Sequence, residues 1–371
     1  MIGQGQKVVV AMSGGVDSSA AALLLHEQGY QVVGVSMQVW DYRKNGGSHS
    51  KATCCAPADF NDARTVADYA GFPFYVFDFE EEFYEAVITP FVRAYSHGYT
   101  PNPCLDCNRK VKFSALRTRA RSLGIGLVAT GHYARILKEE DGTLGLYTSE
   151  NNAKDQSYFL YAMTQEDLLC TMFPIGEMEK ADVRSYLRSH GLDVANKAES
   201  QDICFVSSRV SEFVETEAKR MKSIGDLSGG SIVSVDGAKL GTHDGVHQFT
   251  VGQRKGLGIA HSEPLYVVNI DPQTRDVTVG PRSALEKRQF SVGQVNWISG
   301  RAPENSFDAF VKLRYRQDGV LCRVEPLADG SRAMVTFQGS DSSAVSPGQA
   351  AVFFSNSKRG LRVLGGGIIE R

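Results

Sequence analysis

The sequence lacks the features that mark membrane-spanning, exported and nucleic-acid-coating proteins. Its 371 residues contain no run of about 20 apolar residues, so we expect no membrane span. The net charge is only −2, from 40 Lys and Arg against 42 Asp and Glu, which excludes a uniformly basic coat protein. The first residues lead directly into a strand-like run without a signal-peptide pattern, so we expect a cytoplasmic protein.

Cysteine is scarce, and its count is odd. The seven cysteines are Cys54, Cys55, Cys104, Cys107, Cys170, Cys204 and Cys322. An odd number on a chain without an export pattern argues against a disulfide framework, because the cytosol keeps thiols reduced. We expect Cys170 and Cys322 to be ordinary buried side chains, whereas the pair Cys54-Cys55 has no assignable role.

What is present suffices for a globular protein of two or three domains. Hydrophobic residues make up 42% of the chain, and charged residues, at 22%, are too few for a disordered one. The first half alternates strand and helix patterns, which predicts an α/β fold with a doubly wound parallel sheet. Strands are expected at residues 7–11, 31–37, 74–77 and 126–130. Helices are expected at 18–28, 57–70, 81–94, 109–123, 165–169 and 180–190, and a hairpin at 135–148.

The character of the chain changes near Gly225. Short β-type runs separated by Gly, Asp and Pro turns follow, at residues 231–235, 265–270, 277–279, 310–314 and 333–337. This pattern predicts small β domains or a barrel. The last 91 residues carry 13 Lys and Arg against 8 Asp and Glu, so the near-zero net charge conceals a positive C-terminal part.

A glycine-rich loop follows the first expected strand and opens the first expected helix. It comprises Ala11, Met12, Ser13, Gly14, Gly15, Val16, Asp17, Ser18 and Ser19. Glycines let backbone amides approach an anion, and a helix N-terminus supplies N–H donors, so the loop is a candidate phosphate site with Asp17 as a candidate magnesium ligand. The Lys-Ser/Thr ending of a Walker A loop is absent, and a plain turn is the alternative.

A Cys-x-x-Cys string, Cys104 to Cys107, precedes a basic helix. Asn108 is a candidate N-cap of the helix at 109–123, which would place Cys107 near the helix N-terminus and favour its thiolate. Three interpretations stay open for the cysteines: a four-ligand zinc site, structural burial, or redox and sulfur-transfer chemistry together with Cys204. The zinc interpretation lacks a well-placed second pair of ligands.

The loop string SGGVDSS (13–19) resembles the PP-loop of ATP pyrophosphatases, which split ATP into AMP and pyrophosphate. Ten further strings extend the resemblance over essentially the whole chain, to the bacterial tRNA-specific 2-thiouridylase family. They are TPNPCLDCN (100–108), KF (112–113), ATGHYAR (129–135), KDQSYFLY (154–161), FPIGEMEK (173–180), SQDICF (200–205), TVGQRKGLGIA (250–260), RYRQ (314–317), PGQAAVF (347–353) and LGGGII (364–369).

The resemblance implies an architecture and a reaction. It implies a PP-loop catalytic domain at residues 1–210, a small β-rich central domain at 211–283 and a tRNA-binding β-barrel at 284–371. It further implies that ATP, with Mg²⁺, activates the C2 carbonyl of the wobble uridine in tRNAs for Lys, Glu and Gln. A persulfide sulfur supplied by a cysteine desulfurase or a sulfur-relay protein then replaces the oxygen.

The resemblance also assigns roles to the cysteines. Cys204 matches the persulfide carrier and Cys107 the nucleophile, which would end as a Cys107–Cys204 disulfide. Many family members have Asp where this chain has Cys104, so a thiol stands at a position to which an acid/base role is assigned. As an alternative, Cys104, Cys107 and Cys204 would hold a [4Fe–4S] cluster with one open iron.

The resemblance also implies the remaining candidate contacts. For the nucleotide they are the loop residues 11–18 together with Met37 and Gly131. For tRNA they are Asn102, Pro103, His132, Lys154, Asp155, Gln156, Arg314, Tyr315 and Gln349. A structural role is the alternative for His132. The helix at 109–123 carries six Lys and Arg without an acid between them, which indicates either an RNA-backbone contact or a plain solvated surface.

Two other classes of function compete with this one. A PP-loop ligase or amidase acting on a small molecule would explain the loop but neither the cysteine strings nor the β-rich tail. A non-catalytic RNA-binding module would leave the phosphate loop unexplained.

Overall fold

The computed structural model describes residues 5–41, 57–150, 152–199, 203–221, 227–339 and 343–371. The pair Cys54-Cys55 lies outside these residues. Within them, no helix combines the length and the apolar character that crossing a bilayer requires.

A five-stranded sheet forms the centre of the N-terminal half, and its strand order is β3-β2-β1-β4-β7. All four strand pairings are parallel. The strands are β1 (Lys7–Ala11), β2 (Gln31–Gln38), β3 (Phe74–Asp78), β4 (Leu127–Thr130) and β7 (Thr171–Met172). The four strands expected from the sequence are confirmed, and β1, the first of them, lies in the middle of the sheet.

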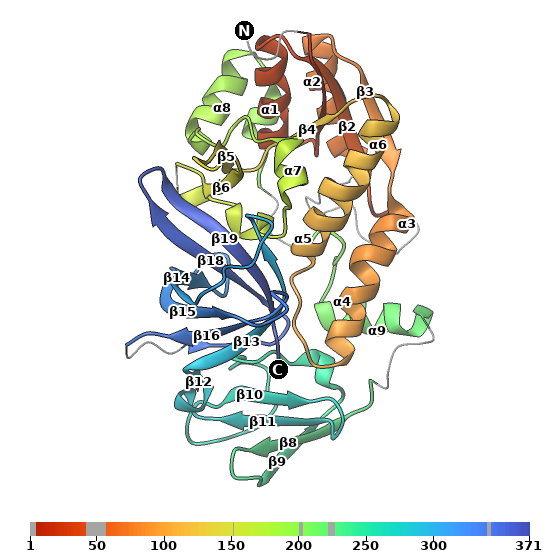
Figure 1. Cartoon of the computed structure of the whole chain (residues 1–371). Helices are drawn as coiled ribbons and strands as arrows, with labels where there is room; N and C mark the ends of the chain where they lie inside the picture. The colour runs from red at the N-terminus through yellow and green to blue at the C-terminus, as the bar shows by residue number, and fades with distance from the viewer. Residues whose placement is uncertain (1–4, 42–56, 151, 200–202, 222–226, 340–342) are drawn as a thin grey trace.

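Helices cover both faces of this sheet, which confirms the doubly wound architecture (Figure 1). Val8 and Val10 point to one face and pack with α1 (Val16–Glu27), α2 (Pro57–Ala70) and α8 (Lys180–Ser189). Val9 points to the opposite face because successive strand residues alternate. The helices on that face are α4 (Thr89–Ser96), α6 (Leu116–Ser122) and α9 (Val210–Met221), with the π-helix η2 (Cys107–Ala115).

Two helical predictions need revision. The helix expected at 81–94 is a run of α3 (Glu80–Phe83), a π-helical turn η1 (Tyr84–Ile88) and α4. The helix expected to start at residue 109 starts instead at α5 (Pro103–Asp106) and continues through η2 into α6. Helix α9 was not expected from the sequence. It packs its buried Val214 against the same cluster as the sheet.

The C-terminal strands close into a barrel, as the resemblance implied. Its strands are β13 (Gln289–Trp297), β14 (Phe307–Lys312), β15 (Val320–Pro326), β16 (Ala333–Phe337), β18 (Ala350–Ser357) and β19 (Gly360–Ile369). The order is β13-β16-β15-β14-β18-β19, and an additional antiparallel pairing of β13 with β19 closes the ring. Closure leaves the ring without free edges, which would otherwise recruit further strands.

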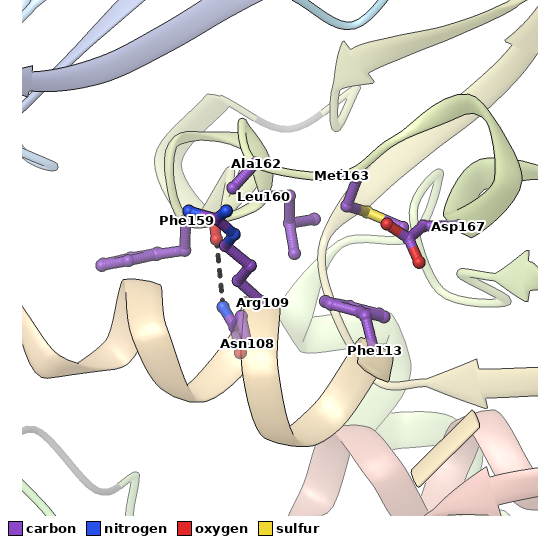
Figure 2. Close-up of a pocket in the computed structure, with 8 residues that line it drawn as sticks. All are labelled: Asn108, Arg109, Phe113, Phe159, Leu160, Ala162, Met163 and Asp167. Atoms are coloured by element: carbon purple, nitrogen blue, oxygen red, sulfur yellow. Dashed lines mark hydrogen bonds between the residues drawn. The ribbon is translucent and has the colours of Figure 1, made fainter. Parts of the chain in front are cut away.

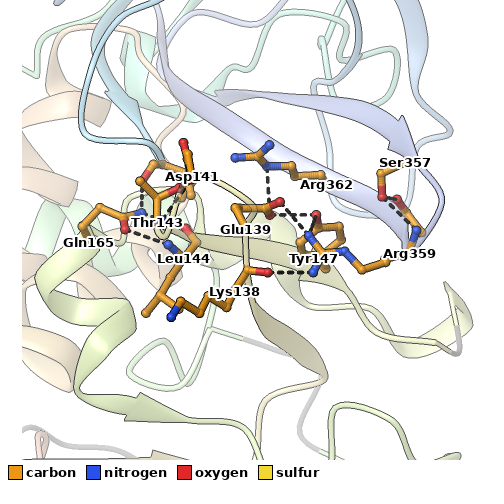
Figure 3. A network of polar contacts seen from close by, with 12 residues as sticks. Lys138, Glu139, Asp141, Thr143, Leu144, Tyr147, Gln165, Ser357, Arg359 and Arg362 are labelled. Carbon is orange, nitrogen blue, oxygen red and sulfur yellow. Dashed lines mark hydrogen bonds and ion pairs between the residues drawn. The ribbon is translucent and has the colours of Figure 1, made fainter.

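A hairpin from the N-terminal half extends the barrel sheet. β5 (Ala134–Lys138) and β6 (Leu144–Thr148) form the hairpin expected at 135–148, and β6 pairs with β19 (Figure 1). Glu139 anchors this junction. It accepts hydrogen bonds from Tyr147 at 2.7 Å and from Arg359 at 2.6 Å, and Arg362 lies 3.5 Å away (Figure 3).

A smaller four-stranded sheet lies between the two larger units in sequence. It contains β8 (Gly230–Ser234), β9 (Lys239–His243), β10 (Tyr266–Asp271) and β11 (Asp276–Gly280), in the order β10-β11-β8-β9. Its own core cluster includes Ile232, Val267 and Val277. Thr250, in the loop before β10, bonds the Thr100 hydroxyl at 3.1 Å and so reaches the N-terminal half.

Candidate active site at the end of the parallel sheet

The glycine-rich loop joins the central strand β1 to helix α1. Gly14 has a φ of +68°, and a Cβ there would lie 2.0 Å from the Asp59 carbonyl oxygen, so only glycine fits. Gly15 is the N-cap of α1 and is extended. The Ser13 N–H donates to the Ser18 hydroxyl at 3.1 Å, which folds the loop over the helix start. The backbone N–H groups at this helix end make it a candidate anion site.

Two lysines distant in sequence hold this loop, and neither was among the predicted site residues. Lys197 donates to the Gly14 carbonyl oxygen at 2.9 Å and to Asp59 and Asp62, both at 2.5 Å. The pKa of Lys197 is raised above its usual value because the hydrogen bonds and charges of Asp59 and Asp62 outweigh burial, the largest single effect, which lowers it.

Asp17 forms the second contact of the loop with distant residues. Both of its carboxylate oxygens lie 2.8 Å from the Lys180 ammonium, and the Tyr133 hydroxyl donates to Oδ1 at 2.7 Å. Burial, followed by the charge of Asp17, raises the pKa of Tyr133. Lys180 also lies 3.3 Å from Glu199. The matched string FPIGEMEK ends on Lys180, so a signal for this residue was present in the sequence.

The residues after β4 reach the same loop. A Cβ at Gly131 would lie 2.5 Å from the carbonyl carbon of Asp17, so glycine is required here by the backbone of α1. The sequence had suggested close approach of a nucleotide as the reason.

His132 accepts or donates a hydrogen bond with Thr130 at 2.7 Å, and its ring packs against Phe113 and Phe173. Burial, followed by the charge of Lys112, holds the pKa of His132 well below its usual value.

Met37, a candidate nucleotide contact, shares one hydrophobic cluster with Cys107 and Cys204, the two cysteines expected to react. Met37, on β2, is partly buried against the cluster on the α4–α9 side of the sheet. Cys107 and Cys204 are half-buried against the same cluster, although 97 residues separate them in the chain. The tertiary structure therefore brings to one region the cysteines that the sequence could only pair by resemblance.

The helix that carries Cys107 begins earlier than expected. Asn102 is its N-cap and accepts a hydrogen bond from the Cys104 backbone N–H at 3.1 Å. The prediction that Asn108 caps the helix is wrong: Asn108 is buried inside η2 and donates to the Phe159 carbonyl oxygen at 3.2 Å. Cys104, which is exposed, therefore lies in the first turn, where the helix dipole acts most strongly, and Cys107 lies one turn later.

Aromatic packing fixes the chain next to Cys204. Phe205 is 2% exposed, and its ring lies 5.3 Å from Phe91, 5.6 Å from Phe83 and 5.1 Å from Phe213. Such tilted and edge-on ring pairs add to the apolar burial. Cys204 is therefore tethered to the core by its neighbour while its own side chain keeps partial exposure.

The described cysteines do not support the cluster alternative. Among the residues that the structure describes, no three His, Cys, Asp or Glu side chains come together as a metal-holding group. Cys104, Cys107 and Cys204 all belong to the described residues. These three cysteines are therefore not part of such a group among the described residues.

The predicted tRNA-contacting string at residues 154–156 has structural contacts of its own. Asp155 is buried and accepts hydrogen bonds from the backbones of Ser149 and Ser157 at 3.1 and 3.2 Å. Gln156 accepts from the Tyr133 backbone N–H at 3.0 Å. Burial raises the pKa of Asp155. Lys154 is the member with a partly exposed charge, and it binds Glu199 at 2.8 Å.

The barrel residues of the predicted tRNA set differ in exposure. Arg314 is exposed in the turn after β14, and the half-buried Tyr315 ring lies 4.6 Å from Phe159. Gln349 donates to the Thr100 carbonyl oxygen, just before Asn102 and Pro103. The contact of Gln349 therefore fixes the segment that leads into the Cys104 helix.

A small pocket lies where η2 meets the segment after residue 156, and Figure 2 shows Asn108 reaching the Phe159 carbonyl across it. It is lined by Asn108, Arg109, Phe113, Phe159, Leu160, Ala162, Met163 and Asp167. The basic helix beyond it is partly neutralised by α7 (Gln165–Leu169), because Arg117 lies 2.7 Å from Asp167 and Arg121 lies 2.7 Å from Glu166. Its positive surface is thus smaller than the sequence suggested.

A parallel sheet whose central strand leads through a glycine loop into a helix, with the Walker lysine absent, defines a PP-loop nucleotide-binding domain. Comparison with known proteins agrees. The model of the tRNA methyl transferase HUP domain matches residues 6–208, that of the tRNA methyl transferase PRC-barrel domain matches 219–281, and that of the aminomethyltransferase beta-barrel domain matches 287–369.

Full-length relatives are more specific. The tRNA-specific 2-thiouridylase MnmA of Geotalea uraniireducens is 49% identical over 368 residues, covering 98% of this chain and 95% of that protein. The protein of the same name from Chloroflexus aurantiacus is 46% identical over 364 residues, covering 98% of both. The chain therefore belongs to the tRNA-specific 2-thiouridylase family and is an enzyme of that class.

Proposed function

We propose that this enzyme uses ATP to convert the wobble uridine of tRNAs for Lys, Glu and Gln to 2-thiouridine, releasing AMP and pyrophosphate. The observation that carries the proposal is the shared hydrophobic cluster, against which Ala11 of the phosphate loop, Met37, Cys107 and Cys204 all pack. The residues proposed to hold the nucleotide and those proposed to carry sulfur thus pack against one core in a chain of the 2-thiouridylase family.

The first step activates the base. The C2 oxygen of uridine attacks the α-phosphorus of ATP, the bond to the bridging oxygen breaks, and pyrophosphate leaves. The N–H groups at the start of α1 stabilise the charge on the phosphates. Met37 and the loop residues are proposed to hold the nucleotide. Asp17 is the carboxylate of the loop that would hold a magnesium ion, and such an ion would neutralise phosphate charge there.

The second step transfers sulfur. A cysteine desulfurase, directly or through a relay protein, is proposed to place a sulfur on Cys204 as a persulfide. The terminal sulfur reaches C2 in one of two ways. Either it attacks C2 itself, and Cys107 then attacks the Cys204 sulfur and breaks the sulfur–sulfur bond, or Cys107 first displaces it as hydrosulfide, which attacks C2. AMP leaves from C2, and a Cys107–Cys204 disulfide remains. A thiol reductant then reduces this disulfide by two electrons and restores both cysteine thiols. Cys104 is the proposed proton acceptor because it is exposed in the first helical turn.

The RNA-binding part of the proposal rests on charge and exposure. Lys154 and Arg314 have partly or fully exposed positive charges suited to phosphates, and Tyr315 offers an aromatic ring for base stacking. We propose indirect roles for Asp155, Gln156 and Gln349, whose polar groups hold protein backbone. Asn102, Pro103 and His132 remain proposed contacts near the reacting base.

Mass spectrometry of tRNA nucleosides tests the function directly. The purified enzyme is incubated with ATP, magnesium, unmodified tRNA, a cysteine desulfurase and cysteine, and the wobble nucleoside is analysed. We expect 2-thiouridine with equimolar AMP. No thiolated nucleoside despite active donor and bound ATP would contradict it.

A further inference from the structure

The Cys-x-x-Cys string places two thiols one helical turn apart. Cys104 lies in α5, and Cys107 follows α5 directly, with its backbone N–H bonded to the Cys104 carbonyl oxygen. Helix geometry separates the Cα atoms of residues three positions apart by about 5 Å, and a disulfide spans about 4.4–6.8 Å between Cα atoms. These two cysteines can therefore form a disulfide with little movement of the backbone.

Contacts on either side of this turn fix its place. The Asn102 side chain accepts a hydrogen bond from the Cys104 backbone N–H at 3.1 Å, before the first thiol. After the second thiol, the Asn108 side chain donates to the Phe159 carbonyl oxygen at 3.2 Å. The spacing of Cys104 and Cys107 thus does not depend on a bond between the cysteines themselves.

The two thiols differ in exposure. Cys104 is exposed, whereas Cys107 is half-buried against the hydrophobic cluster that also contacts Cys204. Cys204 is half-buried too, and its neighbour Phe205 is 2% exposed. The Cys107–Cys204 disulfide that ends the proposed reaction would therefore lie against the protein core.

Reduction of that disulfide is required before a second turnover. Thiol–disulfide exchange needs a thiolate sulfur to reach one of the two disulfide sulfurs, so its rate falls where access is restricted. A protein reductant is bulkier than a small thiol, and burial restricts its access more. Of the cysteines in the described part of the chain, Cys104 is the exposed one, and it lies one turn from Cys107. It is placed to act between the half-buried disulfide and a reductant in solution.

We propose that Cys104 is a further catalytic residue, whose thiol resolves the Cys107–Cys204 disulfide. The inference rests on the proposed function, and the step follows the proton transfer proposed for Cys104. The Cys104 thiolate attacks the Cys107 sulfur, the bond between Cys107 and Cys204 breaks, and Cys204 leaves as a thiolate that takes up a proton. The product is a Cys104–Cys107 disulfide with its first sulfur exposed, and this exchange itself consumes no electrons.

A dithiol protein reductant of the thioredoxin type then supplies two electrons. One of its thiolates attacks the Cys104 sulfur and releases Cys107 as a thiolate, which takes up a proton. The second thiol of the reductant breaks the mixed disulfide, so Cys104 returns as a thiol and the reductant leaves with a disulfide of its own.

Peptide mapping after one turnover identifies the disulfide. The full chain is loaded with persulfide by a cysteine desulfurase, freed of cysteine, given ATP, magnesium and tRNA, and quenched with N-ethylmaleimide in acid. Trypsin separates residues 94–109, which contain Cys104 and Cys107, from residues 198–209, which contain Cys204. A sample without ATP gives the background. In the wild type we expect an internal disulfide in 94–109 and alkylated Cys204.

The variant Cys104→Asp keeps a proton acceptor but lacks the resolving thiol. Its disulfide is expected to cross-link the two peptides. Thiolation over many turnovers is then measured with a thioredoxin-type protein and with dithiothreitol as reductant. We expect the ratio of the two rates to fall at least about tenfold in Cys104→Asp, because only the larger reductant depends on the exposed thiol. Cys170→Ser, which removes a half-buried thiol elsewhere, should leave this ratio unchanged.

Each outcome decides between the two proposals. Cross-linked peptides in the wild type, or an unchanged rate ratio in Cys104→Asp, overturn the resolving role and leave the proposed function standing. Thiouridine formed without any disulfide overturns the resolving role together with the disulfide step. No thiouridine from persulfide-loaded wild type with bound ATP contradicts the proposed function itself. If Cys104→Asp does not fold, Cys104→Ser takes its place with the same expected cross-link.

Discussion

Single residues of the candidate site divide into those whose groups hold the protein backbone and those whose side chains keep partial exposure. The side chains of Asp155 and Gln156 form hydrogen bonds with neighbouring backbone groups. Gly131 must be a glycine because the backbone of α1 leaves no room for a Cβ. Cys107 and Cys204 keep partial exposure beside a packed core. A motif match alone does not separate these two kinds of residue, since both are constrained.

Replacing the proposed persulfide carrier is the sharpest test at this scale. Cys204→Ser removes the sulfur that would carry the persulfide but keeps a side chain of similar size. We expect thiolation to fall at least about 1,000-fold, a loss of the order seen when a nucleophile is removed. Binding of tRNA, measured by filter retention, should stay within about twofold. Phe205 still anchors the segment, so folding should be unaffected.

Cys170→Ser provides the matched control, because Cys170 is also half-buried but lies at the end of α7, beside Arg121. It should thiolate tRNA like wild type. Turnover near wild type in Cys204→Ser would refute the assigned role. Parallel losses in both variants would point to a general effect of removing thiols.

Among the elements, helices α1 and α8 are joined at a second point besides Asp17 and Lys180. At their far ends, His190 Nε2 lies 2.9 Å from Glu27, and the Tyr186 hydroxyl donates to Glu27 at 2.6 Å. The hydrogen bond to the Tyr186 carbonyl, with Glu27 nearby, raises the pKa of His190. The Tyr186 hydroxyl, followed by His190, lowers the pKa of Glu27. The helices that present the phosphate loop and Lys180 are thus pinned together.

The contact between His190 and Glu27 predicts that the stability of the protein depends on pH. The pKa of folded His190 is raised, so its contribution is complete below the unfolded value of about 6.5 and is lost as pH rises through the folded value. Glu27 contributes above its unfolded value, and its contribution is lost only in acid, as pH falls through the lowered folded pKa. His190→Gln should therefore lower the free energy of unfolding more at about pH 5.5 than at about pH 8.5.

Urea unfolding at both pH values measures this difference. The pair is partly exposed, with side-chain exposures of 21% and 46%, so we expect an effect of no more than about 1 kcal/mol. His261→Gln, at an exposed loop histidine, serves as the control. An equal loss of stability at both pH values would show that the ring of His190 acts through packing and not through its charge.

Across the whole molecule, the hairpin β5–β6 ties the nucleotide-binding half to the barrel. Glu139 is only 12% exposed and binds Arg359 and Arg362, both on the β18–β19 side of the junction (Figure 3). Arg135 adds a hydrogen bond to the Arg359 carbonyl oxygen at 2.7 Å. The hairpin that contacts the barrel therefore begins directly after His132 and Tyr133 of the candidate site.

Breaking this junction should destabilise the whole molecule. Glu139→Ala leaves two arginines and the Tyr147 hydroxyl without their shared acceptor, and we expect a loss of about 2–3 kcal/mol in the free energy of unfolding. Chemical denaturation followed by tryptophan fluorescence measures it, since Trp297 is buried in the barrel. The neighbouring exposed Glu140→Ala should change stability by less than about 0.5 kcal/mol. Equal effects would exclude the junction as the cause.

Local chemistry was enough to predict β1, the glycine loop and α1, because strand periodicity, glycine freedom and helix propensity act over a few residues. It failed at the helix of Cys107, although Asn102 and Pro103 are a favoured N-cap and first helical residue. The prediction chose Asn108 because an asparagine at that position is equally capable of capping a helix. Asn108 is instead buried against Phe159, and this contact joins residues 51 positions apart in the chain.

The long-range partners came from folding alone. Asp17 and Lys180 lie 163 positions apart, and Gly14 and Lys197 lie 183 positions apart. Their meeting depends on strand order and on which face each helix covers, and no local pattern encodes either. The packing of Cys107 and Cys204 against one core and the pairing of β6 with β19 likewise depend on the tertiary structure. A sequence specifies which side chains can do chemistry, but the packing of the sheet decides which of them meet, because side-chain contacts act only over a few ångströms.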